Sequence, residues 1–161
     1  MNDNIRRYTT KDSVLFNSQL NNVLSNMYNC RIDFNNTLFN STEQLFQYLK
    51  FSQNEKVKEL MLKTCNGFES KQLANRYNHI KDDDYEEVKY NNMLLCLQLK
   101  FEQCKDFRRF IQSTGNRNLV EYQYWCKNGV PTWGTRIETE DVYMGINATG
   151  RLMMKIREDN K

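Results

Sequence analysis

The sequence predicts an α+β fold, a mostly helical single domain with a small antiparallel sheet, over residues 1–161. Apolar side chains recur at helical spacing between residues 41 and 113, and short β-favouring runs lie on both sides of that stretch. Hydrophobic residues make up 39% of the chain, which is enough for one core, and the single proline argues against a long disordered linker.

The first elements are short strands. Residues 1–11 are polar and are expected to be frayed at their start, whereas residues 13–16 (SVLF) are typical of a strand that enters the sheet. Residues 30–34 and 37–39 are β-favouring runs joined by Asn35-Asn36. Asparagine tolerates the positive φ that a two-residue turn requires, so these runs predict a β-hairpin.

Helices follow the hairpin. The first is expected to start near Ser41, which can cap it, and the second to stop at Asn66-Gly67, where the glycine ends it. The remaining helices and strands are assigned from apolar spacing and turn residues. The helices after the first are expected at residues 54–64, 69–77, 83–103 and 105–113, with further strands at residues 118–122 and 132–136.

One helix carries three polar residues at spacings that place them on the same side. Glu43, Gln47 and Lys50 are at i, i+4 and i+7, away from the apolar face of this helix. With Asn26 from the preceding turn, they could meet in one cleft, which is the candidate active site. The alternative is a solvated face with one weak ion-pair neighbourhood.

Other kinds of site are disfavoured. His79 is the only histidine, and it lies in a polar link where an exposed or capping role is expected. The five cysteines show no C-x-x-C spacing and are expected to be reduced packing residues. The acidic run 82–84 is interpreted as a charged first helical turn. We therefore expect no metal and no cofactor, and the lack of a signal peptide, membrane span or lipidation motif predicts a cytoplasmic protein.

The motifs around the candidate cleft resemble those of the NADAR (YbiA-like) family, whose members carry an LSNFY turn and an SSEHxFQxxKF helix. The matching residues are Leu24, Ser25, Asn26, Tyr28, Ser41, Glu43, Phe46, Gln47, Lys50 and Phe51. The second half matches the family segments TGxxxLVE, WG and GxNxLGxLLMxVR. Those matches are Thr114, Gly115, Leu119, Val120, Glu121, Trp133, Gly134, Gly145, Asn147, Gly150, Leu152, Met153 and Arg157. The sequence departs from the family at Met27, Gln44 and Val130, where Phe, His and Asp are usual.

The resemblance implies an enzyme that cleaves an N-glycosidic bond between a ribose-phosphate moiety and an amine. Such a reaction builds oxocarbenium character, so it needs a carboxylate to stabilise positive charge or activate water, and Glu43 and Glu121 are the candidates. Lys50 either attacks the opened sugar to form an imine or contacts phosphate. Imine formation requires that burial or a cationic neighbour lower the pKa of its amine.

The remaining candidates would bind substrate. Asn26, Tyr28 and Gln47 can hydrogen-bond ribose or diphosphate, and Trp133, which precedes Gly134, can stack on a base. The amides near Gly145 and Asn147 open the last helix, where an anion is favoured. The structural alternatives are a core aromatic at a turn for Trp133, an arginine-paired strand residue for Glu121 and a helix cap for Asn147.

We therefore expect hydrolysis of ADP-ribose from ADP-ribosylated guanine in nucleic acid such as DNA, which would reverse a DNA-modifying toxin in an antitoxin or anti-defence role. Four arginines and a net charge of +3 allow a nucleic-acid partner. These arginines are Arg108, Arg109, Arg117 and Arg136. The alternatives are an N-glycosidase acting on phosphoribosylamino intermediates of riboflavin synthesis, and a non-catalytic ADP-ribose reader, which the Gln44 and Val130 departures would favour.

Overall fold

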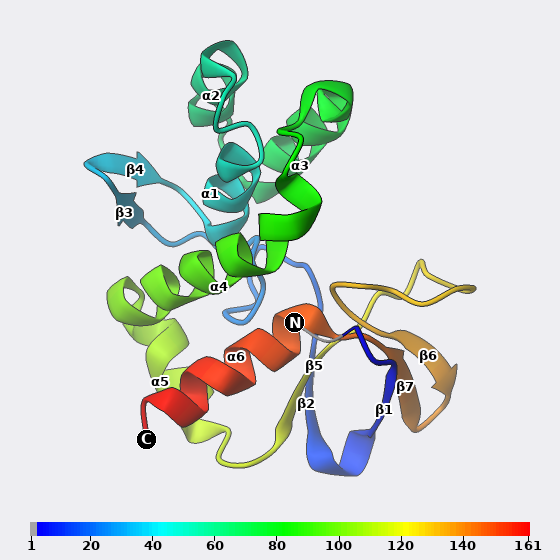
Figure 1. The fold of residues 1–161 in the computed structure, drawn as a ribbon. Helices are drawn as coiled ribbons and strands as arrows, with labels where there is room; N and C mark the ends of the chain where they lie inside the picture. The colour runs from blue at the N-terminus through cyan, green and yellow to red at the C-terminus, as the bar shows by residue number, and fades with distance from the viewer. Residues whose placement is uncertain (1–2) are drawn as a thin grey trace. The chain divides into compact units, whose positions relative to one another are not determined.

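The computed structural model describes residues 3–161, so the predicted fraying at Met1 lies outside the described residues. The chain divides into two compact units. One combines the N-terminal segment up to Ser18 with Arg109–Lys161, and the other is Gln19–Arg108. Six α-helices and three small sheets in the described residues make an α+β fold, as predicted (Figure 1).

The unit Gln19–Arg108 begins with a turn and the predicted hairpin. The hairpin consists of β3 (Ile32–Phe34) and β4 (Thr37–Phe39) in antiparallel register. Asn35 and Asn36 have φ of 53° and 60°, the positive angles that this two-residue turn requires. The hairpin ends just before the first helix, so it sets where that helix begins.

Four helices complete this unit. They are α1 (Thr42–Leu49), α2 (Glu55–Leu62), α3 (Gly67–Arg76) and α4 (Tyr85–Gln103), with the 3-10 helix η2 (Asn78–Ile80) before α4. Helices α2 and α3 pack against α1, and α4 packs on it as well (Figure 1). Phe51, Val57, Met61 and Ala74 form one fully buried cluster among these elements. Helix α1 is therefore enclosed by neighbours, and even its polar residues are buried.

Two expectations about helix ends are wrong. Gly67 does not stop a helix: α2 ends at Leu62, and Gly67 is the first residue of α3, with Asn66 as its N-cap. The acidic run 82–84 precedes the first turn of α4, which begins at Tyr85 and carries Glu86 and Glu87 instead. Asp82 is buried, and its carboxylate accepts hydrogen bonds from the Ser52 hydroxyl and from the Ser52 and Gln53 amides. His79 lies exposed in η2, as expected.

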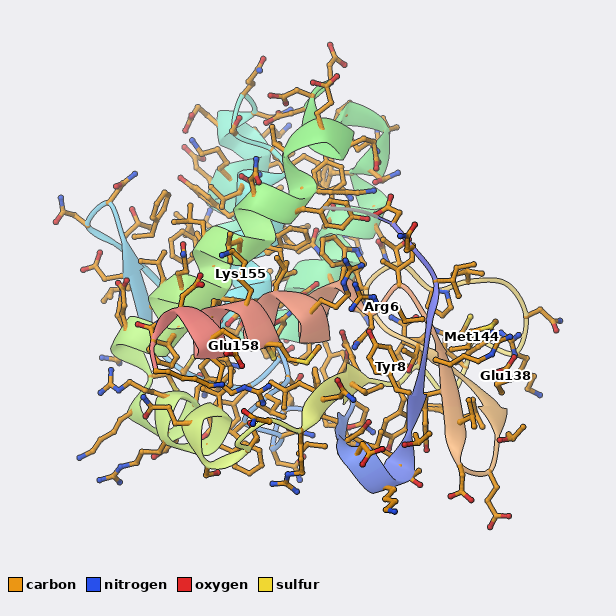
Figure 2. The ribbon with its side chains drawn as sticks, turned by 60° about the horizontal axis from the view of Figure 1, so that its bottom comes forward. Arg6, Tyr8, Glu138, Met144, Lys155 and Glu158 are labelled. Carbon is orange, nitrogen blue, oxygen red and sulfur yellow. The ribbon has the colours of Figure 1, made fainter. Side chains whose placement is uncertain are left out.

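The other unit contains a three-stranded antiparallel sheet and a parallel strand pair. Strand β7 (Val142–Gly145) lies between β1 (Arg6–Thr9) and β6 (Arg136–Thr139), and Tyr8 and Met144 come from neighbouring strands (Figure 2). The 3-10 helix η1 (Thr10–Asp12) leads into β2 (Ser13–Phe16), which pairs in parallel with β5 (Asn118–Glu121). The parallel pair was not predicted, because strand patterns do not specify partners.

The sequence placed some of these strands wrongly. Strand β1 lies within the segment expected to be a polar start, β7 was not predicted, and the strand expected at residues 132–136 lies at β6. Helix α6 (Ala148–Asp159) follows β7 and packs against β5, and Tyr8, Val120 and Tyr143 form a buried cluster. Helix α5 (Lys105–Ser113), at the predicted residues, connects the two units. Among residues 3–161, no helix is long and apolar enough to cross a membrane.

Candidate active site

Helix α1 starts at a capped turn that holds the preceding segment. The Ser41 hydroxyl accepts a hydrogen bond from the Gln44 amide at 3.2 Å, as an N-cap residue should. The Glu43 amide donates to the carbonyl oxygen of Asn26 at 2.9 Å. The structure thus brings the LSNMY turn against the first turn of α1, where the sequence predicted that Asn26 and Glu43 would meet.

The polar side of α1 is buried. Glu43, Gln47 and Lys50 are only 6%, 7% and 7% exposed, so the alternative of a solvated face is wrong. Gln47 Nε2 donates to Glu43 Oε1 at 2.8 Å, the i, i+4 contact expected from their spacing. Burial of three polar side chains on one helix side costs free energy unless they are satisfied or used.

Two buried oxygens beside Glu43 are unsatisfied. Among the described residues, Asn26 Oδ1 and Gln47 Oε1 have no hydrogen-bond partner. The other ends of these amides are engaged, by Glu43 in the case of Gln47 and by the Met93 sulfur at 3.5 Å in the case of Asn26. Buried acceptors without donors are uncommon in folded proteins and are suited to bind a ligand that supplies hydroxyl groups.

Burial also raises the pKa of Glu43 above its ordinary value, since the charged carboxylate is removed from water. Three groups oppose this effect by stabilising the anion: the charge of Lys71, the hydrogen bond from Gln47 and the charge of Lys50. A carboxyl group with a raised pKa can release and take up a proton closer to neutral pH, which suits it to general acid–base chemistry.

Lys50 lies directly after the last residue of α1. Its Nζ donates to Asn78 Oδ1 at 2.7 Å and lies over the ring of Tyr85, 5.1 Å from the centroid. Burial lowers the pKa of Lys50, and the charge of Lys81 lowers it further, whereas Glu86 and Glu43 raise it. Both conditions for an activated amine, burial and a cationic neighbour, are therefore present.

Three contacts of this region could not have been found from the sequence. Asn78, Lys81 and Tyr85 surround Lys50, yet they come from η2 and the start of α4 and belong to no motif. Burial raises the pKa of Tyr85, which therefore stays neutral beside the lysine. Only the folded chain brings these residues to the end of α1.

The departure at Gln44 lies outside the group formed by Glu43, Gln47 and Lys50. Its Oε1 accepts from the Asn40 amide at 2.7 Å, and its Nε2 donates to the carbonyl oxygens of Met61 at 2.9 Å and Thr64 at 3.2 Å. The side chain therefore links the start of α1 to the end of α2. This structural use of Gln44 removes one of the two reasons for the non-catalytic alternative.

Gly67 allows the start of α3 to approach both the LSNMY turn and α1 closely. A Cβ added at this position would lie 2.8 Å from Met27 Sδ and 3.1 Å from Glu43 Cβ. The first of these distances is shorter than those that real Cβ atoms make, so Met27 would have to shift if residue 67 carried a side chain. The contact between Gly67 and Met27, where the family usually has phenylalanine, was not predicted, because this glycine was expected to end a helix.

The second group of candidates lies in the other unit, at the junction of β5 with α6. Asn147 is fully buried with φ of 54°, and its Oδ1 accepts from the Glu121 amide at 3.1 Å while its Nδ2 donates to the Leu119 carbonyl at 2.9 Å. Asn147 is the N-cap residue of α6, as the capping alternative expects, but its side chain makes no capping hydrogen bond. Glu121 is buried, and its Oε1 accepts from the Ser18 hydroxyl at 2.7 Å.

The turn at Trp133 closes over the start of α6. Four backbone hydrogen bonds of 3.0–3.1 Å join the two segments. The amides of Ile146, Asn147, Ala148 and Thr149 donate to the carbonyl oxygens of Pro131, Gly134, Thr132 and Trp133, respectively. A Cβ on Gly134 would lie 2.7 Å from the Glu121 carbonyl oxygen, and one on Gly145 would collide with the Gly134 carbonyl oxygen. These amides are thus already paired with carbonyl groups, where an anion was expected.

An exposed aromatic pair precedes this turn. Tyr124 and Trp125 are 66% and 51% exposed, with ring centroids 5.1 Å apart in an edge-to-face arrangement. Lys127 and Arg136 follow them, and residues 122–137 contain no acidic side chain. The YW dipeptide in this loop could have indicated the exposed aromatic pair. It was missed because only the departure from the family at Val130 was interpreted.

Tyr28 and the cavities of the Gln19–Arg108 unit complete the inventory. Tyr28 is half-buried, and burial raises the pKa of its phenol. A cavity of about 170 Å³ is lined by Met27 of the turn and the N-caps Ser41 and Asn66, among others, and one of about 210 Å³ lies under the hairpin. Glu43 and Lys50 line neither cavity. No group of three or more potential metal ligands occurs among the described side chains.

Comparison with known proteins places the chain in a family. The NADAR domain model matches residues 10–159, which is nearly the whole chain and spans both units. The chain belongs to the NADAR domain family. This NADAR domain is also similar to the NMR structure of the E. coli protein YbiA, with a TM-score of 0.75 and 24% sequence identity over 92% of this chain and 85% of that one. At this identity the similarity shows the fold alone. No curated protein matches the chain.

Family membership points to N-glycosidase-type chemistry for this chain. Within the Gln19–Arg108 unit, the structure brings together Asn26, Glu43, Gln47 and Lys50. Within the other unit, it brings together Glu121, Gly134, Gly145 and Asn147, with Trp133 in the same turn. The first group has the chemical features of a reaction site, and the second is tied into backbone hydrogen bonds.

Proposed function

We propose that this NADAR domain is an N-glycosidase that hydrolyses ADP-ribose from ADP-ribosylated guanine in nucleic acid, and that α1 carries the reaction. The observation that carries the proposal is the buried polar side of α1. It combines a carboxyl group of raised pKa, an amine of lowered pKa and two unsatisfied oxygen acceptors. A ribose offers hydroxyl donors for such acceptors and an electrophilic C1 for the amine.

The residues have separate roles in this reaction. The Lys50 amine attacks C1 of the opened sugar, and the guanine amine leaves as an imine forms between Lys50 and the sugar. Water then hydrolyses the imine to release ADP-ribose and restore the amine. Glu43 transfers the protons that these steps require, and its hydrogen bond to Gln47 fixes its orientation. Asn26 and Gln47 accept hydrogen bonds from the sugar hydroxyls.

The choice of a nucleic-acid substrate is supported by the exposed loop in the other unit. Tyr124 and Trp125 present aromatic surface to solvent, and bases stack on such side chains without regard to sequence. Lys127 adds positive charge in a stretch, residues 122–137, without acidic residues. The four arginines that first motivated this choice support it less, because Arg108, Arg117 and Arg136 each donate to backbone carbonyl groups.

The experiment is a comparison of three substrates at equal concentration. These are a single-stranded oligonucleotide carrying ADP-ribosylated guanine, the corresponding free ADP-ribosyl nucleotide, and a phosphoribosylamino-pyrimidine. We expect release of ADP-ribose, fastest from the oligonucleotide. Equal rates on oligonucleotide and nucleotide would remove the nucleic-acid preference, and cleavage of the pyrimidine alone would favour the riboflavin-precursor enzyme. Tight binding of ADP-ribose without any cleavage would contradict the enzyme and favour the non-catalytic reader.

A further inference from the structure

The segment 78–85 supplies the groups that surround the Lys50 amine. Lys50 Nζ donates to Asn78 Oδ1 at 2.7 Å and lies 5.1 Å from the centroid of the Tyr85 ring. Lys81 lies over the same ring, with its Nζ 5.0 Å from the centroid. None of these side chains belongs to α1, so their contact with the amine depends on how the segment is held against the end of that helix.

Asp82 attaches this segment to the chain on both sides of Phe51, directly after α1. The Asp82 amide donates to the carbonyl oxygen of Lys50 at 3.1 Å. In return, the Asp82 carboxylate accepts from the Ser52 amide at 2.7 Å, from the Ser52 hydroxyl and from the Gln53 amide at 3.3 Å. One residue therefore joins the segment to Lys50 itself and to the two residues that follow Phe51.

These bonds use a buried carboxylate without an opposite charge. Asp82 is 8% exposed, and it takes part in no salt bridge among the described residues. Hydrogen bonds to an ionised acceptor are stronger than those between neutral groups. The three donors on one carboxylate therefore make a firm attachment, and this attachment is independent of the lysines around the site.

Asp82 also lies in the turn that leads to Tyr85. The Tyr85 amide donates to the Asp82 carbonyl oxygen at 3.1 Å, and the Lys81 amide donates to the Asn78 carbonyl oxygen at 3.4 Å. Asn78 lies four residues before Asp82, and Tyr85 lies three residues after it. A displacement of Asp82 would therefore move both groups that contact the Lys50 amine.

We propose that Asp82 is a positioning residue for Lys50, which attaches residues 78–85 to the end of α1 and so holds Asn78 and Tyr85 against the Lys50 amine. This inference rests on the proposed function, in which that amine attacks C1 of the sugar. The Asn78 oxygen accepts one N–H of the amine and fixes its direction. An amide oxygen does so without the negative charge that would favour the ammonium form.

A positioning role and a simple charge effect have opposite consequences for the pKa of Lys50. Burial is the largest influence on this pKa and lowers it. The charged and titratable groups that face the amine are Lys81, Glu86, Glu43 and the Tyr85 phenol. If Asp82→Asn releases the segment, the amine gains water and its pKa rises toward the ordinary 10.5. Loss of a nearby negative charge alone would instead lower the pKa.

The test follows the ionisation of Lys50 without any substrate. The chain is labelled with carbon-13 at the ε-carbon of its lysines and titrated by NMR, and the Lys50 signal is assigned with a Lys50→Arg chain. We expect the titration midpoint of Lys50 to move to higher pH in Asp82→Asn. Asp83→Asn, an exposed neighbour in the same segment, is the matched control and should keep the native midpoint. An unchanged or lower midpoint in folded Asp82→Asn would overturn the proposal.

A milder variant decides the proposal if Asp82→Asn does not fold. Ser52→Ala removes the hydroxyl donor and keeps the backbone donors of Ser52 and Gln53. We expect a smaller movement of the Lys50 midpoint, again to higher pH. A native midpoint in this variant would show that the attachment at Asp82 does not control the surroundings of the amine.

Activity gives a second readout. On ADP-ribosylated oligonucleotide, Asp82→Asn should lower kcat by roughly 10²-fold, the cost of a misplaced reacting group, with little change in KM. The double variant Asp82→Asn with Asn78→Ala should be no slower than the slower single variant, because Asp82 acts through Asn78. Effects that multiply would contradict this order. A chain that cleaves no substrate would contradict the proposed function, whereas the NMR titration would still decide the role of Asp82.

Discussion

The two groups of motif residues each contain a buried acid and a buried amide, but they use them differently. On α1, Gln47 gives its Nε2 to Glu43 and leaves its Oε1 unsatisfied. In the other unit, Asn147 uses both ends of its amide on the backbone of β5, at Glu121 and Leu119. The motif residues thus divide into two kinds: those whose hydrogen bonds stabilise the fold, and those that keep a hydrogen-bond acceptor without a partner.

This difference leads to opposite expectations for substitutions. Replacing a residue that stabilises the fold should lower stability. Replacing a buried residue that serves the reaction should lower activity and can even increase stability. Single substitutions in both groups test this division.

Glu43→Gln should reduce the single-turnover release of ADP-ribose by roughly 10²–10⁴-fold, the usual contribution of a general acid–base group. The amide keeps the shape and can still meet Gln47, so loss of activity would be chemical. The matched control is Glu55→Gln, at the exposed start of α2, which should keep native activity. Native turnover in Glu43→Gln would show that α1 is not the reaction site.

The same variant makes a prediction about pH. Because the pKa of Glu43 in the folded chain is raised above the ordinary 4.5, the native state holds this proton to higher pH than the unfolded chain. Native stability therefore falls as the pH rises from about 4.5 through the folded pKa. Urea unfolding should show Glu43→Gln more stable than the native chain at pH 8 and similar to it at pH 4. If Glu43→Gln were less stable than the native chain at pH 8, burial of the charged Glu43 carboxylate would not destabilise the native state.

Asn147→Ala should lower the free energy of unfolding by about 3 kcal/mol, because it leaves the Glu121 amide and the Leu119 carbonyl unsatisfied and places alanine at positive φ. Urea unfolding measures the change. Asn116→Ala, an exposed position in the same unit, is the control and should change little. If Asn147→Ala kept its stability and lost only activity, Asn147 would belong with the chemical group.

Gly67→Ala should cost roughly 1–3 kcal/mol of stability, since its Cβ would overlap Met27. The double variant with Met27→Ala should recover part of the loss, because Met27 Sδ is the nearest obstructing atom. Unfolding of both single variants and the double variant gives the coupling between the positions. If the changes in the free energy of unfolding were strictly additive, there would be no steric overlap between the two positions.

The smallest effect concerns the pH dependence of turnover. Lys81 lowers the pKa of Lys50, so Lys81→Met should raise that pKa. The part of the pH–rate curve in which the rate increases with pH should therefore shift to higher pH. Lys56→Met, an exposed lysine on α2, is the matched control. An unchanged curve in Lys81→Met would show that the free amine of Lys50 does not govern the rate.

Local patterns predicted much of this fold. The hairpin turn, the start of α1 at Ser41, the strand β2 and the helix α5 lie where the sequence placed them, because caps, turns and apolar spacing are local signals. The edge strand β1 was missed, because a short polar run reads as a tail until a partner is known.

The candidate site was predictable in part for the same reason. Glu43, Gln47 and Lys50 share one helix, so their common face follows from spacing, whereas their burial depends on α3 and α4 packing over that face. The lysine's neighbours, such as Asn78 and Tyr85, come from distant segments and carry no motif. Gln44 shows the converse, since a departure from the family pattern proved to be a structural link between helices.

Trapping the imine would show whether α1 carries the reaction through Lys50. The native chain is mixed with ADP-ribosylated oligonucleotide and sodium borohydride, and the modified peptide is identified by mass spectrometry. We predict a reduced ADP-ribose adduct on Lys50, and a much smaller yield of it in Glu43→Gln. An adduct on the neighbouring Lys71, or steady release of ADP-ribose by a Lys50→Ala chain, would contradict it.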